Sequence, residues 1–161
     1  MPQSLPLPTH MTLRLPTAEA TSRLAERLAP LLAPGDTLLL DGPIGAGKTH
    51  FARALIQTRL GRAEDVPSPT FTLVQTYDGG GVEIWHTDLY RLSHPDEVWE
   101  LGLHDAFSTA ICIVEWPDRL GRHLPQDALR ISLSSEGEGR LATFSGGRKG
   151  LIAALRNAID A

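Results

Sequence analysis

The stretch Leu38-Leu39-Leu40-Asp41-Gly42-Pro43-Ile44-Gly45-Ala46-Gly47-Lys48-Thr49 decides the fold. From Gly42 onward it fits G-x-x-x-x-G-K-[ST], the phosphate-binding P-loop, and it stands between an apolar run and a helical pattern. Glycines let the backbone bend round an anion, and the N–H groups of the loop and the helix start then point at the phosphates. We therefore expect a nucleotide to be bound by Gly42, Pro43, Ile44, Gly45, Ala46, Gly47, Lys48 and Thr49.

Two side chains of this loop carry specific chemistry. Lys48 is expected to neutralise the β- and γ-phosphates as a mobile point charge, and the Thr49 hydroxyl to bind Mg²⁺. The chain has only two lysines, Lys48 and Lys149, and one of them lies in the P-loop. The sequence thus predicts ATP and Mg²⁺ as cofactors, with Lys48 among the catalytic residues.

Composition limits the class of protein. With 161 residues the chain is long enough for one domain with a core, and we expect residues 11–161 to form a single P-loop domain behind a disordered tail over 1–10. A net charge of −4 is not typical of a protein that binds DNA or RNA without a partner. The single cysteine, Cys112, excludes an internal disulfide, and no apolar run reaches membrane-span length. These features indicate a cytoplasmic protein.

Hydrophobic periodicity and turn residues predict alternating helices and strands around the P-loop. Two hairpins are expected, one with its turn at 78–81 and one with its turn at 136–139. The other elements predicted, in chain order, are a strand over 11–15, a helix from a Thr17 N-cap to Leu32, a strand over 37–40, a helix over 48–60 ending at Gly61, hairpin arms over 71–77 and 82–87, a helix capped by Ser93 and stopped by Gly102, a helix over 104–109, a strand over 110–114, a turn over 117–120, hairpin arms over 128–135 and 140–145, and a C-terminal helix.

Carboxylates at two strand ends are candidates to serve the P-loop. Ile111-Cys112-Ile113-Val114-Glu115 is an apolar strand followed by a carboxylate, the Walker B arrangement, and such a residue lies at the crevice where α/β sheets bind ligands. Asp88 ends the second arm of the first hairpin. It could contact Mg²⁺ or position the attacking water, although an Asx turn before Leu89 is an alternative use of its side chain.

Other residues near these strand ends leave alternatives open. Ser68 and Thr70 lie in a proline-fixed loop after the P-loop helix, where switch segments contact the γ-phosphate, or the loop is a plain turn. His86 is as well explained by a structural hydrogen bond as by a functional role. Trp116 suits either packing or a partner surface.

The motifs taken together resemble the TsaE family, also called YjeE. The resemblance lies in the P-loop, then Ser68-Pro69-Thr70-Phe71, then His86-Thr87-Asp88-Leu89-Tyr90-Arg91, then Val114-Glu115-Trp116-Pro117, and it spans about residues 11 to 155. It implies an α/β fold, a three-layer P-loop NTPase-like sheet that is parallel in its centre with antiparallel edge strands. The two predicted hairpins agree with that fold.

The resemblance also implies a function. It points to an ATPase, slow alone and stimulated by partners, that drives a TsaD–TsaB heterodimer in forming N6-threonylcarbamoyladenosine at position 37 of tRNAs reading codons that begin with A. The tRNA would be reached indirectly, through that complex. By motif match Thr49 and Glu115 would ligate Mg²⁺, and Asp88 would be needed for hydrolysis. Thr17 and Ala18, and Gly139 and Arg140, lie where the family's N-terminal segment and last hairpin approach the nucleotide.

The chain departs from the family pattern at a few positions. Pro43-Ile44 replaces an acidic-Leu pair, His50 stands where Thr is usual, and the proline-rich start lies outside the pattern. A small-molecule kinase is the alternative, with Arg119 and Arg122 as a possible lid. A GTP-dependent switch is disfavoured because the chain has no Asn-Lys-x-Asp base-reading motif.

Overall fold

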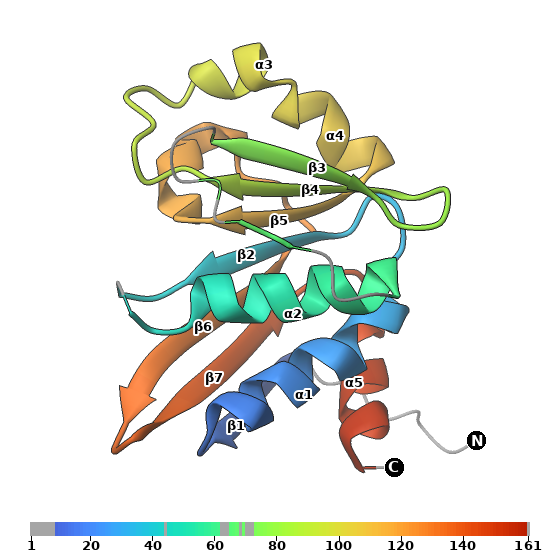
Figure 1. Ribbon diagram of the computed structural model, residues 1–161. Helices are drawn as coiled ribbons and strands as arrows, with labels where there is room; N and C mark the ends of the chain where they lie inside the picture. Colours follow the sequence, from blue (N-terminus) through green and yellow to red (C-terminus); the bar gives the residue numbers. More distant parts are fainter. Residues whose placement is uncertain (1–8, 44, 62–64, 68, 70–72, 161) are drawn as a thin grey trace, which may run out of the picture.

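The protein is described by a computed structural model covering residues 9–43, 45–61, 65–67, 69 and 73–160. Within this part of the chain, seven strands form one mixed sheet in the order β1-β7-β6-β2-β5-β4-β3 (Figure 1). The strands are β1 (His10–Leu15), β2 (Thr37–Asp41), β3 (Val74–Asp78), β4 (Glu83–Asp88), β5 (Ile111–Glu115), β6 (Leu129–Glu136) and β7 (Gly139–Gly146). The helices are α1 (Ala18–Leu28), α2 (Lys48–Leu60), α3 (Glu97–Leu101), α4 (Leu103–Thr109) and α5 (Leu151–Asp160), with 3₁₀ turns η1 (Ala29–Leu31) and η2 (Pro117–His123).

The centre of the sheet is parallel and its edges are antiparallel. Strands β6, β2, β5 and β4 run parallel to one another, whereas β7 and β1 add to one side and β3 to the other in antiparallel pairing. Every residue of β5 is buried, as its unbroken apolar run requires of a strand covered on both faces. The predicted fold class is therefore confirmed.

Helices cover both faces of the sheet, so the molecule has three layers (Figure 1). Alternation along β2 sends Leu38 and Leu40 into the core beneath α1, α2 and α5, and Leu39 into the core beneath α3, α4 and η2. In β5 the same alternation places Ile111 and Ile113 on the α2 face. Because Glu115 follows in that series, its side chain emerges on the face where the P-loop helix begins.

The first helix is shorter than predicted. Its N-cap is Thr17, as expected, and the Thr17 hydroxyl accepts a hydrogen bond of 3.1 Å from the Ala20 amide. The α-helix ends at Leu28 and continues only as the 3₁₀ turn η1, so the prediction of a helix to Leu32 was wrong. Pro30 explains the change, since proline has no N–H and its ring clashes with the carbonyl of residue i−4 in a continuing α-helix.

The helix expected to start at Ser93 begins later. The helix α3 starts at Glu97, and the Glu97 carboxylate accepts a hydrogen bond of 3.0 Å from the His94 amide. The reason is Pro95, because the residue before a proline is driven out of the α region and a helix cannot run through it from Ser93. The predicted stop at Gly102 is confirmed, with this residue in the left-handed conformation at φ 78°.

The remaining predicted elements lie within a few residues of their expected bounds. Both hairpins form, although residues 71 and 72 of the first predicted arm lie outside the described residues, as do residues 1–8 of the predicted tail. The predicted turn after Trp116 is the start of η2. In the part of the chain that the structure describes, no helix has the length and apolar character needed to cross a membrane.

Candidate functional site

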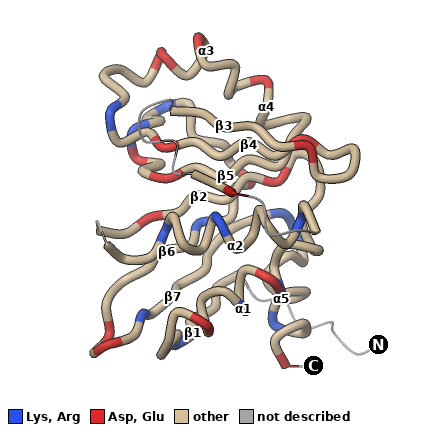
Figure 2. The backbone as a smooth tube through the Cα atoms, in the orientation of Figure 1, with Lys and Arg blue, Asp and Glu red and all other residues tan. Residues whose placement is uncertain are grey.

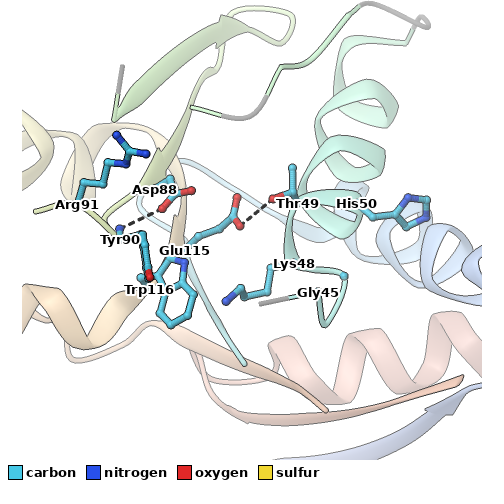
Figure 3. A pocket seen from close by; sticks show the side chains of 10 residues that line it. Gly45, Lys48, Thr49, His50, Asp88, Tyr90, Arg91, Glu115 and Trp116 are labelled. Atoms are coloured by element: carbon cyan, nitrogen blue, oxygen red, sulfur yellow. Dashed lines mark hydrogen bonds between the residues drawn. The ribbon is translucent and has the colours of Figure 1, made fainter. Parts of the chain in front are cut away.

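The P-loop opens onto a cavity of about 460 Å³ at the carboxyl ends of the parallel strands (Figure 3). The strand register brings the two predicted carboxylates together, because Asp88 of β4 pairs with Glu115 of β5. Glu115 also pairs with Leu40 of β2, the strand that leads into the P-loop. The residues that line the cavity are Gly45, Gly47, Lys48, Thr49, His50, Asp88, Tyr90, Arg91, Glu115 and Trp116.

Glu115 joins the P-loop helix to the neighbouring strand. The Thr49 hydroxyl donates a 3.0 Å hydrogen bond to Glu115 Oε1 (Figure 3). His86 Nε2 lies 2.7 Å from Oε2 of the same carboxylate. Glu115 is only 2% exposed, so its carboxylate forms a buried part of the cavity wall. The hydroxyl and the carboxylate are the oxygen donors that Mg²⁺ takes in nucleotide sites.

This donor set fits Mg²⁺ better than a metal held by protein alone. Among the described residues, no three His, Cys, Asp or Glu side chains gather as a metal-binding group. Mg²⁺ in nucleotide sites needs only one or two carboxylates, because phosphate oxygens and water complete its octahedron. The residues present therefore fit a cation that arrives with a nucleotide.

Asp88 is held by the turn that follows its strand. Its Oδ1 accepts a 3.0 Å hydrogen bond from the Tyr90 amide, which is an Asx turn, and its carboxylate faces the cavity beside Glu115 (Figure 3). Burial raises the pKa of Asp88, and the negative charge of Glu115 raises it further, while the Tyr90 hydrogen bond acts in the opposite direction. The turn and the cavity position thus coexist, and the two uses of Asp88 weighed from the sequence are compatible.

Lys48 is folded back in this structure. Its ammonium donates a hydrogen bond to the Gly42 carbonyl and lies 3.6 Å from the ring centroid of Trp116. Burial lowers the pKa of Lys48, whereas the nearby carboxylates, Glu115 foremost, raise it. Trp116 reaches the lysine because its own backbone is left-handed, with φ 60°, an uncommon conformation for a residue with a side chain.

A second cavity of about 260 Å³ adjoins the first and shares Gly47 and His50 with it. It is lined by Leu15, Thr17, Ala18, Thr21, Gly47, His50, Glu138, Gly139 and Arg140. The structure therefore brings Thr17 and Ala18 of the α1 start beside Gly139 and Arg140 of the last hairpin.

Arg140 contacts the P-loop itself. Its guanidinium donates hydrogen bonds to the carbonyls of Gly45, at 3.0 Å, and Ala46, at 3.2 Å. The P-loop helix contacts α1 through His50, whose Nε2 lies 2.9 Å from Ser22 Oγ and 3.2 Å from the Ala18 carbonyl oxygen. The P-loop and the start of its helix are thus held by contacts with residues distant in sequence.

The predicted site and the observed cavity do not contain the same residues. Ile44, Ser68 and Thr70, all predicted to bind the nucleotide, lie outside the described residues. Tyr90, Arg91 and His50 also line the first cavity, although they were not among the site residues predicted from the sequence. A signal did exist for Tyr90 and Arg91, because they directly follow a strand that ends in a candidate carboxylate.

Comparison with known proteins decides the family. A family model described as "Threonylcarbamoyl adenosine biosynthesis protein TsaE" matches residues 15–142. The chain belongs to the TsaE family. Members with the name "tRNA threonylcarbamoyladenosine biosynthesis protein TsaE" include one from Rickettsia conorii, 39% identical over 75% of this chain and 69% of the relative. Another, from Bacillus subtilis, is 38% identical over 74% of this chain and 75% of the relative.

The fold comparison agrees with this TsaE assignment. The crystal structure of Bacillus subtilis YdiB aligns over 98% of both chains, with a TM-score of 0.75 and 27% identity. The resemblance to TsaE drawn from the motifs is therefore confirmed, and the protein is a P-loop member of a family of tRNA threonylcarbamoyladenosine biosynthesis.

Proposed function

We propose that the protein binds ATP with Mg²⁺ and hydrolyses it slowly to drive a TsaD–TsaB heterodimer. That complex would form N6-threonylcarbamoyladenosine at position 37 of tRNAs that read codons beginning with A. The observation that carries the ATPase part is the 3.0 Å hydrogen bond from Thr49 to Glu115, which joins the P-loop helix to the end of β5. A P-loop threonine beside a strand-end carboxylate is the pairing that phosphoryl-transfer sites use to hold their cation.

The P-loop and the two strand-end carboxylates of the cavity have separate roles in this proposal. The P-loop amides cradle the phosphates, Lys48 leaves the Gly42 carbonyl for the β- and γ-phosphates, and Thr49 and Glu115 hold Mg²⁺. When bound, the cation neutralises charge that develops on the phosphates. Asp88 orients the attacking water or a metal-bound water. The second cavity takes the nucleoside, with Thr17, Ala18, Gly139 and Arg140 around it.

The proposed partners are inferred from the family and from the negative net charge of the chain. The net charge is −4, and Figure 2 shows that Asp and Glu positions are interspersed with Lys and Arg positions along the described backbone. A net negative charge does not suit direct binding of a nucleic acid, so tRNA would be reached through TsaD–TsaB in the cytoplasm.

The first test removes the P-loop lysine. Lys48→Ala should weaken ATP binding by on the order of 100-fold, since it deletes a charged hydrogen-bonding group from the phosphate site. Calorimetric titration with ATP measures this, and phosphate release should fall with it. The matched control is Lys149→Ala, which removes the other lysine from an exposed position before α5. Equal affinity for ATP in both variants would contradict the assignment.

The alternative of a small-molecule kinase finds less support. Of the two arginines considered as a lid, Arg122 forms a 2.8 Å ion pair with Asp96, and Arg119 lies over the Tyr90 ring. Release of inorganic phosphate from ATP without any added acceptor would favour the ATPase over the kinase.

A further inference from the structure

His86 is a buried polar residue to which the proposed mechanism gives no role. It is 0% exposed and lies on β4, two residues before Asp88. Side chains alternate along a strand, so His86 and Asp88 project from the same face, the one that faces α2. From there the His86 ring reaches across to Glu115 of the adjacent β5, with 2.7 Å between Nε2 and Oε2.

The surroundings of the ring show which nitrogen carries the proton. Nδ1 of His86 is buried and has no hydrogen-bond partner among the described residues. A proton on Nδ1 would leave a buried N–H donor unsatisfied, whereas a proton on Nε2 is donated to a carboxylate. The ring thus donates a hydrogen bond through Nε2 to the carboxylate of Glu115.

The two oxygens of the Glu115 carboxylate accept hydrogen bonds from different residues. Oε2 accepts from His86 on the core side, and Oε1 accepts from Thr49 on the cavity side. A carboxylate with both oxygens engaged by different elements cannot rotate without breaking a buried hydrogen bond. Groups behind a metal ligand act in this way, because they fix its orientation and basicity.

We propose that His86 is a positioning residue, which holds Glu115 so that Oε1 is presented beside Thr49 to the Mg²⁺ of the bound nucleotide. This inference rests on the proposed MgATP function and adds a residue to it. The competing explanation is that His86 only fills space in the core between β4 and β5. The two differ in one measurable property, the dependence of nucleotide binding on Mg²⁺.

Two amide variants separate the explanations. In glutamine the terminal nitrogen stands four bonds from Cα, as Nε2 does in histidine, so His86→Gln retains a donor that reaches Glu115. In asparagine the nitrogen stands three bonds from Cα, where Nδ1 stands, so His86→Asn keeps a polar group but loses that reach. Ile84→Ala is the packing control, because Ile84 is also 0% exposed and projects from the same face of the same strand.

The experiment measures ADP affinity by calorimetry in EDTA and across a series of Mg²⁺ concentrations, with a melting curve for each variant. We expect His86→Asn to need about ten- to hundredfold more Mg²⁺ for its half-maximal gain in ADP affinity, with its affinity in EDTA unchanged. His86→Gln should stay within about threefold of the wild type. Ile84→Ala should melt at a lower temperature while keeping the wild-type Mg²⁺ requirement.

Several results would overturn the inference. One is an unchanged Mg²⁺ requirement in His86→Asn, and another is an equal loss of ADP affinity with and without Mg²⁺. If His86→Asn does not melt cooperatively, His86→Gln decides, and a tenfold rise in its Mg²⁺ requirement counts against the inference. Wild-type protein that binds no nucleotide would overturn the proposed function and this inference with it, so the two failures are distinguishable.

Discussion

Glu115 and Asp88 are neighbours at the ends of adjacent strands, yet their side chains are held differently. Glu115 is bonded to Thr49 and His86, while Asp88 is bonded to the Tyr90 amide in its own turn. The first arrangement suits a fixed metal ligand. The second suits a group that acts when the nucleotide and the attacking water are in place.

This difference predicts separate effects of two isosteric changes. Glu115→Gln should raise the Mg²⁺ concentration needed for ATP binding, because it weakens a metal ligand. Asp88→Asn should still bind MgATP but should lose most phosphate release, on the order of 100-fold, as expected for a group used mainly in the transition state. ATP titrations at several Mg²⁺ concentrations, together with turnover in the presence of the partners, measure both. A swapped pattern would exchange the two assignments.

Asp88 also makes stability depend on pH. Burial raises its pKa in the folded state, so the folded protein binds this proton more tightly than the unfolded chain does. The stability linked to the proton is present at low pH and is lost as pH rises through the folded pKa. Asp88→Asn should therefore melt above the wild type at pH 8, without Mg²⁺ or nucleotide, and this gain should shrink as the pH is lowered toward 4.

The control for this measurement is Asp127→Asn, an exposed carboxylate in the loop before β6. It should change the melting temperature little at either pH. A gain for Asp88→Asn that grows toward acid would show that the charge on Asp88 stabilises the folded state, contrary to the burial argument.

At the scale of elements, the exit of β2 into the P-loop depends on the neighbouring strand. Gly42 has φ 140°, and a Cβ on it would overlap the Leu133 carbonyl oxygen of β6. Gly45 also has positive φ, at 82°, but a Cβ there meets no atom within 4 Å. The two positions separate backbone strain from steric overlap.

Alanine at these glycines should therefore have unequal effects. Gly45→Ala should cost about 1 kcal/mol of unfolding free energy through strain alone, and Gly42→Ala more than about 3 kcal/mol through strain plus displacement of β6. Urea unfolding of both variants measures the difference. Similar losses in the two variants would mean that the approach of β6 to Gly42 is not what limits this position.

At the scale of the molecule, we expect the isolated protein to be a poor ATPase. The Ser68–Thr70 segment contains no arginine that could act as a preassembled arginine finger, so we expect the site to be completed from outside or by ordering of a loop. Addition of TsaD–TsaB should raise phosphate release at least about tenfold. Lys48→Ala with the same partners is the control for their own background. Rapid turnover by the protein alone, unaffected by TsaD–TsaB, would contradict the expected dependence.

The sequence by itself determined the fold class, the family and most helix and strand positions. The P-loop lies between an apolar run and a helical pattern, which local periodicity reveals, and the carboxylates Asp88 and Glu115 end strands that the sequence marks clearly. The end of α1 and the start of α3 differ from the prediction because Pro30 and Pro95 interrupt the apolar helical pattern at those positions.

Only the tertiary structure decided how these residues meet. The hydrogen bonds from Thr49 and His86 to Glu115 follow from the register of β4 against β5 and from the seating of α2 on the sheet. Arg140 reaches the P-loop carbonyls because β7 folds back beside it, and Trp116 reaches Lys48 because its backbone turns left-handed. Such contacts join positions far apart in the chain, and local periodicity carries no information about strand order, register or the turn of a single backbone dihedral.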